Sequence, residues 1–257
     1  MPTEIQRIPG IFALPTDWPR VRLGSIAGAW GEWVADDAKA TDMTAAGTTT
    51  GSPLVLPWTS RTGSLHLTTQ TGSGLPTLRT DPNQVRGHKY TSHTGQGLQT
   101  GTVNYTGPLT IAMMVRASGT GTTASQYLFS TATGLSSAAH IIRWNQANGN
   151  LEAVLTGSAR DADVDIAPTL GAPLASSVWS PVVACFNGAG SYVQVGSTRV
   201  TGNLGGSYPV TLLRFANQFS TGGYSLNGRL THMRVYQRAL TAEEAAMTVE
   251  DLTALYG

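Results

Sequence analysis

The strongest constraint on the fold of this chain is a series of short apolar segments that recur roughly every 10 residues. The segment Leu109–Val115 carries Leu, Ile, Met and Val at alternate positions, which is the period of a β-strand with a buried face. The dipeptides Asn148-Gly149 and Asn187-Gly188 lie between such segments and favour the positive φ of tight hairpins. This pattern is typical of an antiparallel β-sandwich. Further strands are predicted at Gln126–Ser130, Ala139–Trp144, Leu151–Leu155, Val178–Phe186, Tyr192–Val195 and Val210–Phe215.

The end of the chain predicts a helix. Thr241 followed by Glu244 has the spacing of a capping box, in which each side chain bonds the other residue's backbone N–H. Before it, Leu230 and Val235 fall on opposite parities of one strand, so we expect a β-bulge near His232. After the cap, apolar side chains follow the helical period at Ala245, Ala246, Val249, Leu252 and Leu255.

The segment Arg214–Glu244 resembles the closing segment of concanavalin A-like lectin/glucanase domains of the laminin-G type. In that family a glycine-containing turn, here Tyr224–Gly228, leads into a strand with an Arg-aliphatic-Tyr motif, here Arg234–Tyr236, and then into a capped helix. Weaker similarity extends the resemblance over nearly all of Trp30–Tyr256. It implies an all-β fold: a concanavalin A-like jelly-roll β-sandwich of two antiparallel sheets with a short C-terminal helix. The same sandwich occurs in lectins, glycosidases, adhesion modules and virion proteins, so it leaves the function open.

Residues 1–20 are predicted to form an extended arm, and residues 21–257 to form the sandwich. Prolines punctuate the arm, and each fixes φ and removes a backbone donor. The arm is also unusually apolar for a free tail. It either packs on its own domain or docks on another subunit. The candidate docking residues are Ile8, Ile11, Phe12, Leu14 and Trp18.

Charge narrows the choice of partners. Charged side chains make up only 12% of the chain, and the net charge is +1. Because no basic block occurs, we expect neither nucleic acid nor an anionic membrane as a partner. No apolar run approaches the ~20 residues of a membrane span, and the first residues lack the pattern of a secretory signal peptide. Cys185, the only cysteine, lies in an apolar run and is expected to be buried.

Catalysis in the glucanase branch of the fold requires two carboxylates at alternate positions of one strand, about 5 Å apart in retaining enzymes. The sequence lacks such a motif, so we predict a protein that is not an enzyme and requires no cofactor. Alternating aspartates do occur in a segment rich in small residues. That segment is expected to be a solvated loop or, alternatively, a Ca²⁺ site, because such carboxylates supply hard oxygen ligands. The aspartates are Asp161, Asp163 and Asp165.

Sugar binding by such a sandwich would use aromatic faces and planar polar side chains near loops. The best candidate region is Trp144–Asn150, where an aromatic residue meets a polar hairpin. For every candidate the alternative is a role in the core or in hairpin packing. The candidate ligand-binding residues are Trp144, Asn145, Asn148, Tyr192, Tyr224 and Asn227.

Three hypotheses for function follow. The first is a non-enzymatic bacteriophage virion structural protein: a head decoration, fibre or tail-surface subunit made in the host cytoplasm. It would be a homo-oligomer, attach to other virion subunits through the arm and present the sandwich to host-surface glycans. The second is a carbohydrate-binding or adhesion module on a bacterial extracellular surface. The third, a polysaccharide-cleaving enzyme, is disfavoured by the missing carboxylate pair.

Overall fold

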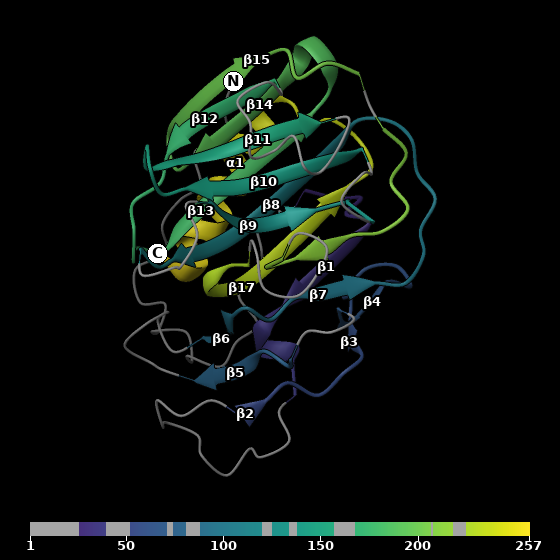
Figure 1. Cartoon of the computed structure of the whole chain (residues 1–257), viewed down its shortest axis with the longest axis vertical. Coiled ribbons are helices and arrows are strands. Elements are labelled where there is room, and N and C mark those ends of the chain that lie inside the picture. The colour runs from purple at the N-terminus through teal and green to yellow at the C-terminus, as the bar shows by residue number, and fades with distance from the viewer. Residues whose placement is uncertain are drawn as a thin grey trace, which may run out of the picture.

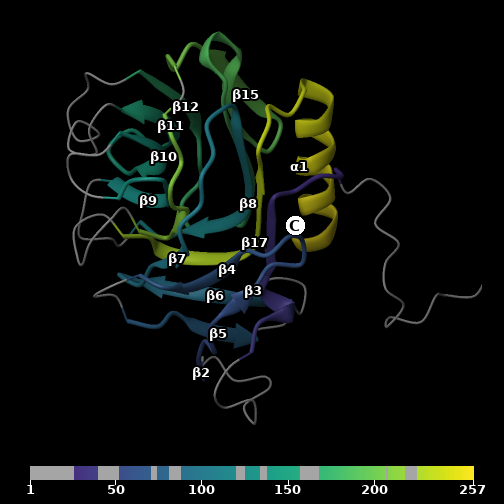
Figure 2. The same cartoon turned by 90° about the vertical axis from the view of Figure 1, so that its right-hand side faces the viewer.

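The computed structural model describes residues 26–39, 52–70, 74–80, 88–119, 125–133, 138–156, 168–206, 208–217 and 225–257 (Figure 1). These residues form two antiparallel sheets that face each other across a shared core. Helix α1 (Ala242–Tyr256) lies against the outer side of one of them (Figure 2). The predicted fold class, an all-β sandwich of two antiparallel sheets with a C-terminal helix, is confirmed. The predicted arm, residues 1–20, lies outside the described residues.

Sheet A is the sheet that carries the helix. Its order is β15-β14-β13-β8-β17-β6-β5-β2, and β1 also pairs with β17. Its strands are β1 (Gly31–Val34), β2 (Ser52–Pro53), β5 (Thr77–Thr80), β6 (Lys89–Thr94), β8 (Leu109–Ala117), β13 (Ser180–Phe186), β14 (Ser191–Val195), β15 (Thr198–Gly202) and β17 (Asn227–Tyr236).

Sheet B forms the other layer of the sandwich. Its order is β12-β11-β10-β9-β16-β7-β4-β3. Short 3-10 helices, η1 (Ala35–Asp37) and η3 (Gly188–Gly190), follow β1 and β13. The strands of sheet B are β3 (Trp58–Thr59), β4 (His66–Thr69), β7 (Leu98–Thr100), β9 (Ser125–Ser130), β10 (Ala139–Asn145), β11 (Asn150–Thr156), β12 (Thr169–Pro173) and β16 (Arg214–Phe215).

Strand β8 lies near the middle of sheet A and is buried on both sides. The alternating apolar residues predicted for Leu109–Val115 all lie in the core between the sheets, so that prediction is confirmed. Ala112 and Met114, which lie between them, face the other way and pack in clusters with residues of α1. The outer face of sheet A is therefore covered by the helix along part of its length.

Strand β17 contains the predicted bulge. Leu230 pairs with Val115 of β8, but the next pair joins His232 to Met114, so the register shifts between the two. The extra residue lets Leu230 and Val235 both face the core despite their opposite parities. The bulge also directs His232 to the outer face, where its ring contacts Tyr256 of α1.

Helix α1 begins with the predicted capping box. The Glu244 backbone N–H donates to Thr241 Oγ1 at 3.1 Å, and the Thr241 N–H donates to the Glu244 carboxylate at 2.9 Å. Ala245 and Val249 pack against the outer face of sheet A, in a cluster that includes Cys185. Cys185 is buried, as predicted. No helix among the described residues is long and apolar enough to cross a membrane.

Some strand boundaries differ from the predicted ones. Strand β13 begins at Ser180 rather than Val178, whose side chain is 52% exposed. The predicted strand Val210–Phe215 is reduced to β16, with a separate bridge between Val210 and Tyr105. Strands β12 and β15, like β1 to β6, were not among the predicted strands. β12 and β15 are edge strands with few buried side chains, so the apolar pattern is weak there.

Candidate functional site

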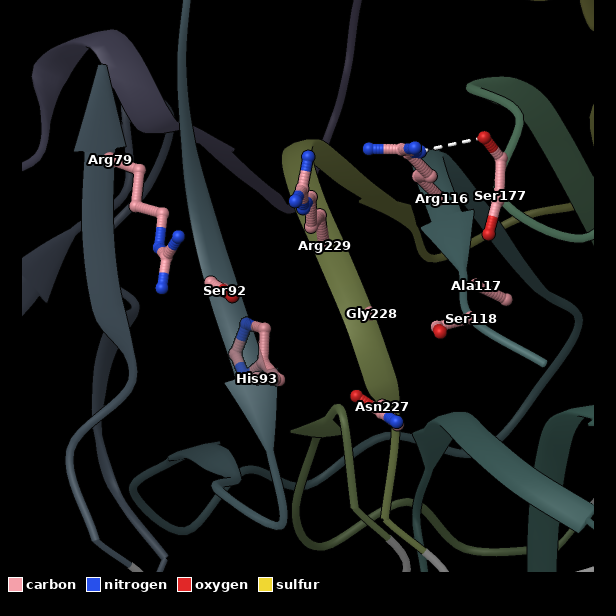
Figure 3. A pocket seen from close by; sticks show the side chains of 10 residues that line it. All are labelled: Arg79, Ser92, His93, Arg116, Ala117, Ser118, Ser177, Asn227, Gly228 and Arg229. Carbon is pink, nitrogen blue, oxygen red and sulfur yellow. Dashed lines mark hydrogen bonds between the residues drawn. The ribbon is translucent and has the colours of Figure 1, made fainter. Parts of the chain in front are cut away.

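The outer face of sheet A carries a polar hollow beyond the area covered by the helix (Figure 3). Its volume is about 200 Å³, and strands β5, β6, β17 and β8 form its base. We call it the arginine hollow, because Arg79, Arg116 and Arg229 line it. The other described lining residues are Ser92, His93, Ala117, Ser118, Ser177, Asn227 and Gly228.

Strand register brings the arginines together. Arg229 of β17 pairs with Arg116 of β8 on one side and with Ser92 of β6 on the other. Arg79 pairs with Tyr90, which lies two residues before Ser92 and therefore on the same face. Ser92, Arg229 and Arg116 thus form one row across neighbouring strands, and Arg79 lies on the same face, two positions out of that row.

Two of the arginines are held in place by neighbours. Arg116 Nε donates to the backbone oxygen of Ser177 at 2.7 Å. The guanidinium of Arg229 lies 4.9 Å from the centre of the Tyr90 ring, in a cation–π contact. Tyr90 in turn packs edge-on against Trp179, with ring centres 5.8 Å apart. These contacts fix the guanidinium groups before any ligand arrives, which lowers the entropic cost of binding.

The ends of β8 and β17 are pinned together at one side of the hollow by Gln126. Its side-chain amide donates to the Ser118 oxygen at 2.7 Å, and its Oε1 accepts the Asn227 N–H at 2.9 Å. A Cβ at position 228 would lie 2.5 Å from the backbone oxygen of Arg116, so Gly228 permits the close approach of the strands. Asn227, a predicted ligand-binding residue, does line this hollow.

Ser177 lies at the hollow in an uncommon backbone conformation. Its φ is 60°, in the left-handed region that non-glycine residues seldom adopt. The Ser177 N–H donates to the Ala117 oxygen at 2.7 Å, and its own oxygen accepts the bond from Arg116. Strain of this kind costs on the order of 1 kcal/mol and concentrates at binding sites.

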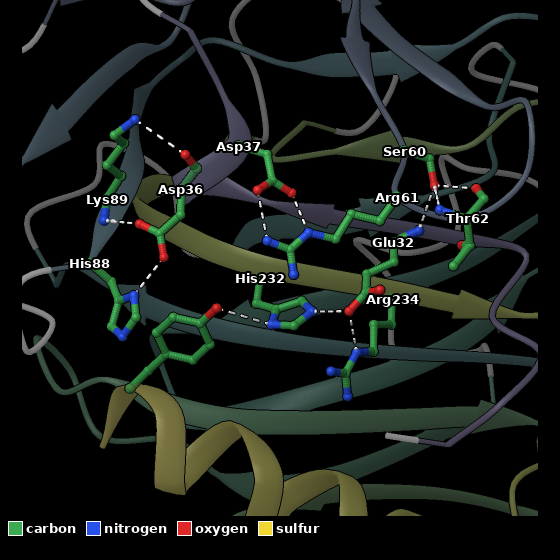
Figure 4. Close-up of polar contacts among 11 residues, drawn as sticks. Glu32, Asp36, Asp37, Ser60, Arg61, Thr62, His88, Lys89, His232 and Arg234 are labelled. Carbon is green, nitrogen blue, oxygen red and sulfur yellow. Dashed lines mark hydrogen bonds and ion pairs between the residues drawn. The ribbon is translucent and has the colours of Figure 1, made fainter. Parts of the chain in front are cut away.

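A buried polar network lies under the helix on the same face of sheet A (Figure 4). His232 Nε2 lies 2.7 Å from Glu32 Oε1, and Arg234 Nε donates to the same oxygen at 3.0 Å. A terminal nitrogen of Arg234 pairs with Asp251 of α1 at 2.8 Å. Burial alone would raise the pKa of Glu32, but the hydrogen bond and charge of His232, with the charge of Arg234, hold it well below the usual value. This network fastens β1 and β17 to the helix.

Two further carboxylates, Asp36 and Asp37, also have structural partners. Asp36 accepts the Lys89 N–H at 2.7 Å and lies beside His88, while Asp37 forms a forked pair with Arg61 (Figure 4). The His88 and Lys89 contacts hold the pKa of Asp36 below its usual value, although burial alone would raise it. Within the described ranges, no group of three or more His, Cys, Asp or Glu side chains is arranged to hold a metal ion.

In the predicted hairpin site, the Asn145 and Asn148 side chains form hydrogen bonds within the hairpin itself. Trp144 is 4% exposed and packs in the core between the sheets, so its ring offers no face to a sugar. Asn145 and Asn148 each donate to Glu152 Oε1, at 3.1 and 2.9 Å, and each Oδ1 accepts a backbone N–H within the turn. Glu152 also accepts from Arg143 at 2.7 Å. The polar atoms of this hairpin are used to shape the turn.

Tyr192 is likewise a packing residue. Its ring is 1% exposed, its hydroxyl donates to the Leu240 oxygen at 3.1 Å, and Arg199 covers the ring at 3.5 Å. Other predicted site residues lie outside the described residues. These are Tyr224, the candidate Ca²⁺ ligands Asp161, Asp163 and Asp165, and the candidate docking residues Ile8, Ile11, Phe12, Leu14 and Trp18.

The arginine hollow was not predicted from the sequence. Its arginines lie on β5, β8 and β17, and only the strand order shows that they are neighbours. Arg116 carried a weak signal, because it continues the outward-facing parity of Ala112 and Met114 at the end of an apolar strand. No local motif distinguishes the others.

Comparison with known proteins agrees with this architecture. Residues 87–246 match the family model described as the concanavalin A-like lectin/glucanases superfamily. A search of curated proteins found no match. Domain 4 of AbnA, an extracellular GH43 arabinanase from Geobacillus stearothermophilus solved with arabinotriose, has a similar structure, with a TM-score of 0.60 and 12% identity. That similarity covers 86% of this chain and 98% of the domain.

A sialidase from Trypanosoma rangeli, solved in complex with 2,3-difluorosialic acid, is also similar, with a TM-score of 0.57 and 13% identity. The match covers 90% of this chain but only 34% of the sialidase. At such identities the similarity establishes the fold alone.

Proposed function

This chain belongs to the concanavalin A-like lectin/glucanases superfamily, and from that premise we propose that it is a carbohydrate-binding module that acts by binding, without catalysis. The observation that carries the proposal is the arginine hollow on sheet A. At about 200 Å³ it is smaller than the ~300–1,000 Å³ pockets of drug-sized ligands, which suits one sugar unit of a longer glycan.

The chemistry of the hollow suits a sugar. Guanidinium, hydroxyl and amide groups of Arg116, Arg229, Ser92 and Asn227 offer hydrogen-bond donors and acceptors to ring hydroxyls. The strands beneath are pinned by Gln126, so these groups stand on a rigid base. The relative of similar fold that was solved with arabinotriose supports glycan binding as the role of such a sandwich.

The carboxylates support a binding role rather than hydrolysis. A glycosidase needs one carboxylic acid and one carboxylate across the scissile bond, ~5–9.5 Å apart. Among the described lining residues of the hollow there is no Asp or Glu. Glu32, Glu152 and Asp37 are held in ion pairs with Arg234, Arg143 and Arg61, which fasten β1, β11 and η1 to their neighbours.

The test is a panel of soluble polysaccharides, neutral and acidic, run by affinity gel electrophoresis and calorimetry with the whole chain. We expect at least one polysaccharide to bind, Arg229→Gln to weaken that binding, and Arg61→Gln, which removes a charge elsewhere, to leave it unchanged. We also expect no release of reducing sugar. Failure of the wild-type chain to bind any member, or hydrolysis of any member, would refute the proposal.

The virion hypothesis is compatible with this function and stays a prediction. It depends on residues 1–20, which lie outside the described residues, so its arm docking, homo-oligomer and virion location remain expectations. The bacterial surface hypothesis places the same binding module on a cell. Negative-stain imaging with an antibody against the sandwich separates them: labelled phage particles support the first, and labelled cells without labelled particles support the second.

A further inference from the structure

The arginine hollow concentrates positive charge in a chain that carries little. The whole chain has a net charge of +1, yet three of its arginines line one hollow of about 200 Å³. The described lining residues include no carboxylate. Burial lowers the pKa of His93 to about 4, so this neighbour is neutral at pH 7 and adds no charge. Among the described lining residues, an anionic group placed in the hollow would therefore meet charges of one sign.

The strand register opposes two cations. Arg229 and Arg116 are direct cross-strand partners on β17 and β8, and like charges in this position repel each other. Nothing in the fold of a sandwich requires that pairing, since most residues are tolerated on a solvent-facing strand end. A bound anion between the two guanidinium groups would turn the repulsion into attraction. Functional sites are where proteins most often break such a local rule.

The geometry also suits an oxyanion. Figure 3 shows Arg116 and Arg229 side by side on β8 and β17, with Arg79 extending from β5 toward β6. Each guanidinium is a planar fork that can bond two oxygens of a carboxylate or sulfate at once. Because Ser177 and Tyr90 already hold two of the forks, little side-chain freedom is lost when an anion binds.

From this charge and geometry we propose that the arginine hollow recognises an acidic sugar unit, with its carboxylate or sulfate bound between Arg116 and Arg229. Ser92 and Asn227 would contact the ring hydroxyls. This rests on the proposed function, because it names the class of glycan taken by the same site. Binding should weaken as salt is added, since the groups are partly open to solvent.

The experiment uses two pairs of polymers that differ mainly in charge. Polygalacturonate and its methyl ester test the carboxylate, and dextran sulfate and dextran test the sulfate. Calorimetry on the whole chain should detect at least one charged polymer and give no comparable signal for its neutral twin. Whichever pair responds identifies the source of the anion.

Variants assign the binding to the hollow. Arg116→Gln and Arg229→Gln should each weaken binding about tenfold or more, the usual loss for a charged hydrogen bond. Arg61→Gln removes one positive charge outside the hollow and is expected to bind as the wild type does. Melting curves of all variants check that they are folded.

Each alternative outcome is decisive. If Arg61→Gln weakens binding as much as Arg229→Gln, the attraction is unspecific and the proposal is wrong. If neutral glycans bind as well as acidic ones and the hollow variants lose both, the glycan site stands but its acidic specificity does not. If neutral glycans bind and the hollow variants are unaffected, glycan binding stands at another site. If no polymer in either panel binds, both proposals fail.

Discussion

Arg229 and Arg234 lie on the same strand, face the same side of sheet A and have opposite environments. Arg234 is 2% exposed, lies under helix α1 and pairs with Glu32 and Asp251. Arg229 is half-buried, stacks on Tyr90 and lines the arginine hollow. The bulge between Leu230 and His232 is what puts both on one face, since they are five positions apart.

The difference shows how one strand serves two purposes. Where the helix covers the sheet, a buried cation must be matched by carboxylates, because an unmatched buried charge is very costly. Where the helix ends, Arg229 is only half-buried, so its charge keeps contact with solvent and does not require a buried carboxylate. The same residue type is therefore structural at one end of β17 and, in our account, functional at the other.

The largest effect is expected for a substitution in the part of β17 that helix α1 covers. Arg234→Gln takes the guanidinium away from buried Glu32, which keeps only its bond to His232, and from half-buried Asp251, so we expect the free energy of unfolding to fall by about 3–5 kcal/mol. Arg229→Gln should change it by less than about 1 kcal/mol, because the lost cation–π contact is offset by relief of repulsion from Arg116. Urea unfolding followed by tryptophan fluorescence measures both. Equal losses would contradict the assignment of different roles.

The stability contributed by His93, at the hollow, and by Glu32, under the helix, should be lost in different pH ranges. Burial lowers the pKa of His93 to about 4, below the ~6.5 of an unfolded histidine, so the unfolded state binds more protons between these values. Stability from neutral His93 is thus lost as the pH falls from about 6.5 to 4, on the order of 3 kcal/mol. Glu32, whose pKa is lowered, contributes stability that is lost only as the pH falls below about 4.5.

Urea unfolding at a series of pH values measures the free energy of unfolding in both pH ranges. His93→Gln should reduce the slope between pH 6.5 and 4 without removing it, because buried His140, with a pKa lowered to about 4, titrates in the same window. Glu32→Gln should reduce the slope only below about pH 4.5. If His93→Gln changed the free energy of unfolding only below about pH 4.5, the assignment of these pH ranges to His93 and Glu32 would be wrong.

A smaller effect is expected for the Gln126 hydrogen bonds that join the ends of β8 and β17 beside the hollow. Gln126→Ala removes two partly buried hydrogen bonds, one donated to the Ser118 oxygen and one accepted from the Asn227 N–H, so we expect the free energy of unfolding to fall by about 1–3 kcal/mol. Because the ends of β8 and β17 would then be less firmly held, glycan affinity should also fall. Calorimetry and urea unfolding on the same samples test this. A loss of stability with unchanged glycan affinity would show that binding at the hollow does not depend on the Gln126 hydrogen bonds.

The smallest expected effect concerns the helix cap. Thr241→Ala removes the hydroxyl that accepts the Glu244 N–H and should cost about 1 kcal/mol, with glycan binding unchanged. Thr253→Ala, on the last turn of the same helix, is the control and should cost less, since its hydroxyl bonds only the Val249 oxygen. A change in affinity with Thr241→Ala would link the helix to the hollow, against our account.

The sequence predicts those parts of the fold that depend on local patterns. The alternation in Leu109–Val115, the bulge near His232 and the capping box at Thr241 each involve residues within a few positions of one another, and all are confirmed. Edge strands β12 and β15 escape prediction because little of their surface is buried. The short β16 shows that pairing, rather than composition, decides where a strand ends.

The candidate site was harder to predict, because it depends on long-range strand pairing rather than on local patterns. Trp144 and the asparagines of its hairpin have the residue types of a sugar site, but sequence alone does not show that the ring faces the core or that Glu152 uses both amides. Trp144→Ala is therefore expected to destabilise the fold rather than remove a binding surface. Conversely, Arg79, Arg116 and Arg229 become neighbours only through long-range strand pairing.

The most direct test of the account is to observe the arginine side chains while a glycan binds. Nε–H signals of Arg116, Arg229 and Arg234 can be followed by ¹H–¹⁵N NMR as the glycan identified by calorimetry is added. We predict that the signals of Arg116 and Arg229 shift until the site is saturated, while the signal of Arg234, which lies under the helix, does not shift. Saturable binding with no shift at Arg116 or Arg229 would contradict it.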